Sequence, residues 1–77
     1  MVQNRKKLIA AIRHEFVVCL ADEMNYINRD SLTPDWDYIF VEVFQAIAKR
    51  GFDINSYEKD IIEEYDRLIR VFESFST

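Results

Sequence analysis

Hydrophobic residues recur at spacings of three and four along almost the whole chain, the pattern of helices that bury one side. The pattern breaks at a polar stretch over 28–35 and again around Gly51. We therefore expect an all-α fold, a three-helix bundle with helices at about 4–27, 34–50 and 55–75. The whole chain, 1–77, forms a single helical domain, and dimerisation would complete so small a bundle.

The first segment has a wide hydrophobic side. Its apolar residues follow a helical face, with Leu8, Ile12, Phe16, Leu20, Met24 and Ile27 in steps of three or four. The β-branched pair Val17-Val18 would also suit a short strand over 16–20. No second strand with a convincing pattern exists to pair with it, so a helix is the better interpretation.

The start of the second segment carries several helix signals. Thr33 is expected to be the N-cap, because its hydroxyl can accept a backbone N–H of the first turn. Pro34 suits the first helical position, where its missing N–H would have gone unused. Asp35 and Asp37 would then lie in the first turn and stabilise the positive end of the helix dipole.

The end of the second segment is marked just as clearly. Lys49 and Arg50 place positive charge in the last turn, where the helix dipole is negative. Gly51 is expected to take the left-handed conformation that ends many helices. Phe52 would then fold back toward Ile47, the hydrophobic contact that accompanies such an end.

The third segment has two alternative starts. Asn55 with Glu58 would make a capping box, whereas Asp53 as the N-cap would allow Phe52 and Tyr57 to form a hydrophobic staple. On the polar side of this helix, acids precede bases by four residues, which favours two ion pairs, Glu63–Arg67 and Asp66–Arg70.

Residue types that usually act in catalysis or metal binding are few in this chain. Cys19 is the only cysteine, so an internal disulfide and a structural zinc site of the Cys/His type are excluded. His14 is the only histidine, and neither Glu15 nor Cys19 shares its side of a helix, so no catalytic pair forms within the segment. Calcium-loop, di-iron and glycine-rich phosphate-loop patterns are missing. We expect no metal, no cofactor and no enzymatic activity.

The net charge of −4 is unevenly distributed. Residues 1–14 hold four bases and no acid, a net +4, whereas residues 15–77 hold six bases and fourteen acids, a net −8. Most of the fold should therefore repel a nucleic-acid backbone. The chain has no apolar run long enough to span a membrane and no recognisable secretory signal, which indicates a cytoplasmic protein.

The predicted helices carry more apolar surface than a domain of this size needs for one core. A second buried surface would explain this surplus, and small domains without disulfides often gain support from a partner chain. We expect binding to another protein or self-association as a homodimer. The expected contacts are apolar residues of the first two predicted helices: Val17, Leu20, Met24, Trp36, Tyr38, Phe40, Val41 and Phe44.

These features predict a small acidic protein-binding factor, such as a regulator, an inhibitor or an accessory subunit, that acts without turnover. The alternative is a regulator that binds nucleic acid or an anionic membrane surface through residues 3–14, with the basic patch Arg5, Lys6, Lys7 and Arg13. The acidic sides of the second and third helices could instead imitate nucleic acid. A small enzyme would require His14 to meet an acid from the third helix.

Overall fold

The computed structural model describes residues 5–26 and 34–76, and these form three α-helices. Helix α1 spans Arg5–Tyr26, α2 spans Trp36–Lys49 and α3 spans Ile54–Ser76. Every pair of helices is in contact, and the described residues contain no strand. The predicted all-α three-helix bundle is confirmed, and the alternative of a strand over 16–20 is wrong.

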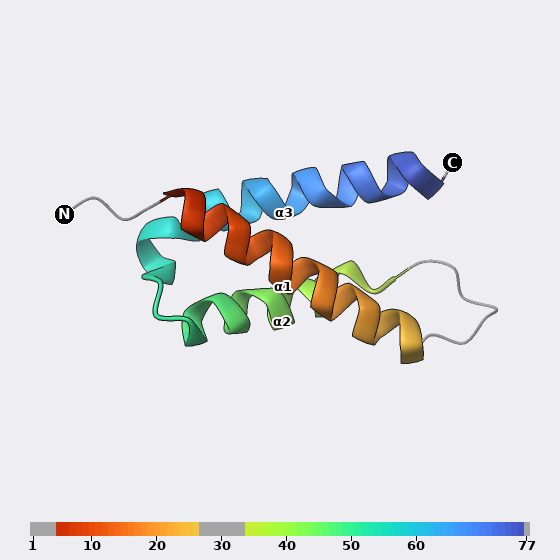
Figure 1. Cartoon of the computed structure of the whole chain (residues 1–77), viewed down its shortest axis with the longest axis horizontal. Helices are drawn as coiled ribbons and strands as arrows, with labels where there is room; N and C mark the ends of the chain where they lie inside the picture. Colours follow the sequence, from red (N-terminus) through yellow and green to blue (C-terminus); the bar gives the residue numbers. More distant parts are fainter. Residues whose placement is uncertain (1–4, 27–33, 77) are drawn as a thin grey trace.

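The directions of the helices follow from the contacts between them. Two ion pairs, Arg5–Asp60 and Arg13–Glu64, join the N-terminal halves of α1 and α3, so these two helices run parallel. Helix α2 runs back between the end of α1 and the start of α3 (Figure 1). Figure 1 also shows that α1 and α3 separate toward their C-terminal ends. The bundle is therefore closed at one end and open at the other.

The hydrophobic core lies where the three helices meet. Its fully buried members, Leu8 and Ile12 of α1, Ile39, Val43 and Ile47 of α2, and Ile61 of α3, recur at helical spacing on the inner sides. Each such side chain contributes about 1.5–3 kcal/mol by leaving water. Ala11, Phe16 and Tyr65 complete the buried set.

The start of α2 differs from the sequence prediction. Helix α2 begins at Trp36, and its N-cap is Asp35, whose backbone is extended and whose side chain accepts the N–H of Tyr38 at 3.1 Å. Pro34 precedes the cap and is not helical. A carboxylate caps a helix as well as a hydroxyl does. Because the Asp35 carboxylate accepts the N–H of Tyr38, helix α2 starts at Trp36, two residues after Pro34. Thr33, the predicted cap, lies outside the described residues.

The predicted end of α2 is confirmed. Gly51 has a φ of +96°, a conformation that residues with a Cβ rarely adopt. The N–H of Gly51 donates to the carbonyl of Ala48 at 3.0 Å, which satisfies one of the last carbonyls of the helix. Phe52 then packs against the core cluster that contains Ile47.

Of the two predicted starts of α3, the Asp53 cap is the correct one. The Asp53 carboxylate accepts the N–H groups of Asn55 and Ser56 and, at 2.8 Å, the hydroxyl of Ser56. The hydrogen bond from the Ser56 hydroxyl is the main reason why the pKa of Asp53 lies below its usual value. Phe52 and Tyr57 both pack against the core, as a hydrophobic staple requires. The capping box at Asn55 is wrong, because Asn55 lies inside the helix.

Replacing Asp35 by Ala should lower the free energy of unfolding by about 1 kcal/mol, because the N–H of Tyr38 loses its acceptor. Urea unfolding followed by circular dichroism measures the loss. Asp37→Ala is the matched control and should cost less, about 0.3 kcal/mol, because Asp37 acts only through the helix dipole. Equal losses in the two variants would contradict the assignment of Asp35 as the cap.

Candidate protein-binding surface

Trp36, the first residue of α2, lies between the two parallel helices. Its ring stacks on Phe16 of α1 with a centroid distance of 6.1 Å and an interplanar angle of 6°. It meets Phe72 of α3 edge-on, at 5.5 Å and 76°. Offset-stacked and edge-to-face pairs are the favourable arrangements of aromatic rings. Trp36 therefore acts as a wedge where α1 and α3 separate.

Tyr65 of α3 holds Trp36 in place through contacts with neighbouring rings and a hydrogen bond. Its ring contacts Phe16 at 5.6 Å and Phe40 at 5.0 Å, both edge-on, and its hydroxyl donates to the backbone carbonyl of Trp36. Burial is the main reason why the pKa of Tyr65 is raised, so the hydroxyl remains protonated and able to donate. The Nε1–H of Trp36 is buried and finds no acceptor among the described residues.

Glu64 of α3 closes the other end of the α1–α3 pair. It is only 9% exposed and accepts from Arg13 of α1 at 3.0 Å and from Arg67 at 3.0 Å. Burial works to raise the pKa of Glu64, but the hydrogen bonds from Arg67 and Arg13 outweigh it, and the pKa lies below its usual value. One carboxylate between two guanidinium groups leaves this cluster with a net charge of +1.

The sequence-based pairing of charges on α3 is therefore wrong. Arg67 pairs with Glu64, three residues before it, and not with Glu63. Glu64 is nearly buried and also pairs with Arg13 across the helix interface. Water weakens an ion pair less at such a position, so Arg67 interacts more strongly with Glu64 than it would with the exposed Glu63. The predicted Asp66–Arg70 ion pair does not occur among the described residues.

Beyond this ion pair, α1 and α3 carry apolar residues at matching steps along the chain. Steps of 4, 7 and 11 residues from Arg13 reach Val17, Leu20 and Met24, and the same steps from Glu64 reach Leu68, Val71 and Phe75. Such steps stay on one side of a helix. We call these six residues the α1–α3 apolar surface.

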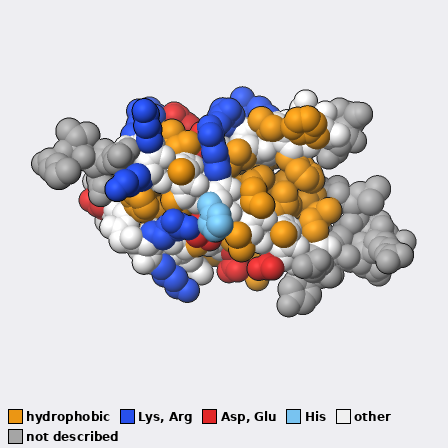
Figure 2. Space-filling model, viewed as in Figure 1, with side chains coloured by type: hydrophobic (Ala, Val, Ile, Leu, Met, Phe, Trp, Pro, Cys, Tyr) orange, Lys and Arg blue, Asp and Glu red, His pale blue; other side chains and the backbone are white. Residues whose placement is uncertain are grey.

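Most of the α1–α3 apolar surface is open to solvent. Val17 is 63% exposed, Met24 47%, Val71 41% and Phe75 86%, while Leu20 and Leu68 are half-buried. Figure 2 shows hydrophobic side chains gathered over the C-terminal halves of α1 and α3. Gatherings of this kind on a small protein mark sites of interaction.

The structure divides the predicted interface residues into three groups. Val17, Leu20 and Met24 belong to the α1–α3 apolar surface, and Trp36 lies behind it. Phe40 and Phe44 contact each other on α2 and are half-buried. Tyr38 and Val41 are exposed on α2. The predicted interface residues thus differ widely in exposure.

The α3 half of this surface is not among the interface residues predicted from the sequence. Leu68 and Phe75 fall on the same helical spacing as the buried Ile61 and Tyr65, so the sequence alone does not separate them from the core. A usable signal was present, since the same 4, 7 and 11 spacing follows Arg13 and Glu64. The spacing gains meaning only once Arg13 is known to face Glu64, which requires the tertiary structure.

The predicted basic patch is partly neutralised by the fold. Arg5 pairs with Asp60 and Arg13 with Glu64, each at 3.0 Å. Lys6 and Lys7 are exposed, and both also take part in interactions. Two of the four bases thus serve the α1–α3 contact, which weakens the argument for binding of nucleic acid or an anionic membrane surface.

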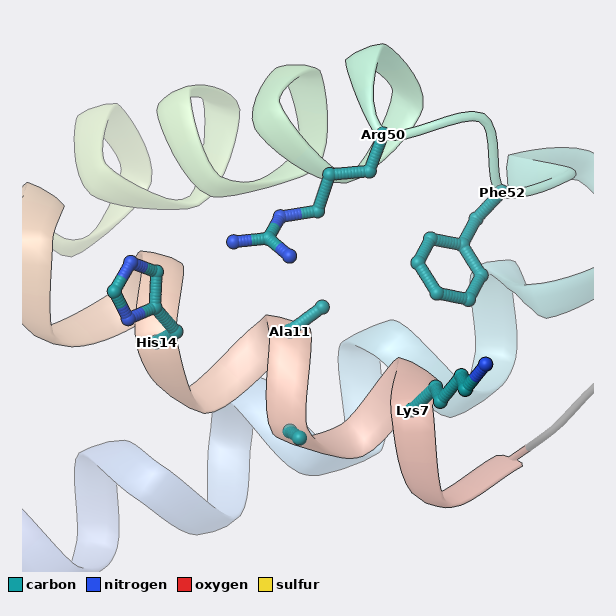
Figure 3. A pocket seen from close by; sticks show the side chains of 6 residues that line it. Lys7, Ala11, His14, Arg50 and Phe52 are labelled. Atoms are coloured by element: carbon teal, nitrogen blue, oxygen red, sulfur yellow. The ribbon is translucent and has the colours of Figure 1, made fainter.

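A shallow hollow of about 560 Å³ lies on the other flank of α1, between α1 and the end of α2. Ala10, Ala11 and Phe52 line it with apolar atoms, while Lys7, His14 and Arg50 stand around it (Figure 3). Arg50 also pairs with Glu15 at 2.8 Å. The hollow therefore combines small apolar side chains with a basic edge.

No group of three or more His, Cys, Asp or Glu side chains in 5–26 and 34–76 is placed to hold a metal ion. Cys19 is half-buried, and burial, followed by the charge of Glu15, raises the pKa of its thiol, which disfavours the reactive thiolate. None of the described helices is both long and apolar enough to cross a membrane.

Comparison with known proteins gives no relative: no family model, no curated protein and no solved structure matches this chain.

Replacing Trp36 by Ala should lower the free energy of unfolding by about 2–4 kcal/mol, because the wedge between Phe16 and Phe72 is lost. Trp36→Phe should cost much less, since it keeps an aromatic ring and removes an unpaired buried N–H. Urea unfolding of both variants tests this. If Phe were as damaging as Ala, the ring contacts would not be the source of the stability.

Replacing Glu64 by Gln should cost about 1–2 kcal/mol at neutral pH, since both arginines are half exposed and water screens part of the interaction. The pKa of Glu64 is lowered by folding, so its contribution is present above the unfolded-state pKa and disappears as the pH falls through the folded-state value. The difference between wild type and variant should therefore shrink on acidification.

Urea unfolding at several pH values measures this difference. Glu63→Gln is the matched control, because Glu63 is the exposed neighbour of Glu64, and it should change stability little at any pH. A difference that stays constant from neutral to acidic pH would contradict the role given to the Glu64 charge.

Proposed function

We propose that this chain acts by binding another protein stoichiometrically and without turnover, as a small acidic regulator, inhibitor or accessory subunit. The observation that supports this proposal is the α1–α3 apolar surface, which is open to solvent in a domain of the size that often gains stability from a partner chain. An exposed Phe such as Phe75 is also a residue type enriched at protein interfaces.

The equal spacing on the two helices favours a partner that contacts both at once. Val17 and Met24 on one side and Val71 and Phe75 on the other lie on helices that separate progressively. An apolar segment of a partner that enters between them would bury side chains of both helices, and burial contributes about 25 cal/mol for each Å² removed from water.

The charge at the closed end of the surface adds a preference. The cluster of Arg13, Glu64 and Arg67 has a net charge of +1, and both arginines are half exposed. An acidic group beside the apolar segment of the partner would meet this charge. Such pairs at the edge of an interface act mainly on association rate and specificity.

The test compares two substitutions on α3. Val71 and Ile62 are β-branched and each 41% exposed, but only Val71 belongs to the α1–α3 apolar surface. Val71→Glu should weaken binding of the partner at least about tenfold, whereas Ile62→Glu should leave it unchanged. Proteins retained from extracts of the native host by the wild type but not by Val71→Glu are identified by mass spectrometry.

The identified protein is then purified and titrated against wild type and both variants by calorimetry. Circular dichroism checks that both variants remain folded. Equal retention of every bound protein by Val71→Glu and Ile62→Glu would refute the proposal.

A further inference from the structure

The directions of the three helices indicate what kind of segment would fit the α1–α3 apolar surface. The backbone N–H of Asp35, just before α2, donates to Glu23 near the end of α1 at 3.3 Å. Arg50, just after α2, pairs with Glu15 in the middle of α1 at 2.8 Å. Helix α2 therefore runs antiparallel to α1, and also to α3, because α1 and α3 are parallel (Figure 1).

Helix α2 also shows which side chains the α1–α3 pair accepts. Its fully buried residues, Ile39, Val43 and Ile47, are four residues apart and lie along one side of the helix. They belong to the core cluster, and α2 is in contact with both α1 and α3. One flank of the parallel pair is thus already covered by an antiparallel helix with an aliphatic side.

The α1–α3 apolar surface lies on a different flank. On each helix its residues share the side of one member of the Arg13–Glu64 ion pair, which shows where these two sides meet. Glu15, which reaches α2, is two residues from both Arg13 and Val17, about 200° around α1. This second flank has exposed apolar side chains on both helices and no antiparallel helix of the chain over it (Figure 2).

The form of this flank favours a helix as the segment that covers it. The described residues contain no strand, so they offer no sheet edge to which a partner strand could add. An amphipathic helix laid on two helices with apolar sides is a common mode of recognition. From Arg13 to Met24 the surface is about 16 Å long, because an α-helix rises about 1.5 Å per residue. About three turns of a partner helix would cover it.

Charge favours one direction for this helix. The cluster of Arg13, Glu64 and Arg67, with its net charge of +1, lies at the closed end of the surface, and the C-terminal ends of α1 and α3 lie at its open end (Figure 1). A helix is partly negative at its C-terminus and partly positive at its N-terminus. An antiparallel partner helix therefore meets opposite charge at both ends, whereas a parallel one meets like charge.

We propose that the partner contributes an amphipathic α-helix that lies antiparallel to α1 and α3 on the α1–α3 apolar surface, with its acidic C-terminal end beside Arg13 and Arg67. This inference rests on the proposed function and deepens it, because it specifies the form and the direction of the partner's segment. The complex is then a four-helix bundle in which α2 and the partner helix cover two flanks of the α1–α3 pair.

The form of the segment is tested with synthetic peptides of about 20 residues that overlap along the sequence of the captured partner. Calorimetry against the full chain identifies the peptide that binds, and circular dichroism should show that this peptide gains helix in the complex. Pro at a central polar position of the peptide should weaken binding at least about tenfold, whereas Ala at the same position should not. A tolerated Pro overturns the proposal, and so does a partner of which no single peptide binds.

The direction is tested with nitroxide labels in a Cys19→Ala background. Glu63→Cys and Glu73→Cys place the label at exposed positions of α3 that are ten residues, or about 15 Å, apart. The label at 63 should broaden the amide signals at the C-terminal end of the peptide, and the label at 73 those at its N-terminal end. The reverse pattern, or equal broadening by both labels, overturns the proposed arrangement.

The charge contact is tested by a double-mutant cycle. Changing the acidic residues in the last turn of the peptide to their amides should weaken binding to the wild type about threefold or more. The same change should have little effect on binding to Arg67→Gln. Arg70→Gln is the matched control, because Arg70 is exposed on the same helix outside the cluster, and it should respond like the wild type. Equal losses in Arg67→Gln and Arg70→Gln would remove the acidic end from the proposal.

The two proposals fail separately. If no retained protein distinguishes Val71→Glu from Ile62→Glu, the proposed function fails and this inference fails with it. A protein that makes this distinction but binds through a non-helical or a parallel segment overturns only the inference. If sedimentation equilibrium shows a doubling of the 9.2 kDa chain mass that Val71→Glu abolishes, a second copy occupies the surface, and both proposals are overturned.

Discussion

The position of Trp36 between Phe16 and Phe72 is the constraint on which the rest of this structure depends. A large ring inserted between two parallel helices keeps them apart at that level. Tyr65 holds the wedge from the side, through its ring contact with Phe16 and its hydrogen bond to the Trp36 carbonyl. The start of α2 thus determines the distance between α1 and α3.

The two ends of the α1–α3 pair are held by different forces. At the closed end, Glu64 lies between two arginines and is nearly buried, which is where a carboxylate gains most from its partners. At the open end, Leu20 and Leu68 still pack against the core, whereas Val17, Met24, Val71 and Phe75 are exposed. Charge fixes the register of the two helices, and the aromatic wedge fixes their divergence.

Much of the fold could be predicted from the sequence because its signals are local. The helical spacing, the left-handed Gly51 and the Asp53 cap depend on neighbours within four residues. The cap of α2 was misassigned, since Thr33 and Asp35 are both good caps and the choice depends on where the chain leaves Pro34. Partners of Glu64 could not be predicted, because Arg13 reaches it from another helix.

The open apolar surface cannot be relieved within the three helices themselves. For the open ends of α1 and α3 to come together, the two helices would have to close over the space that Trp36 occupies between Phe16 and Phe72. Expelling Trp36 would give up both of its ring contacts and the hydrogen bond to its carbonyl. The contacts of Trp36 that stabilise the core therefore leave the apolar residues at the open end exposed. We infer that another polypeptide chain covers these residues.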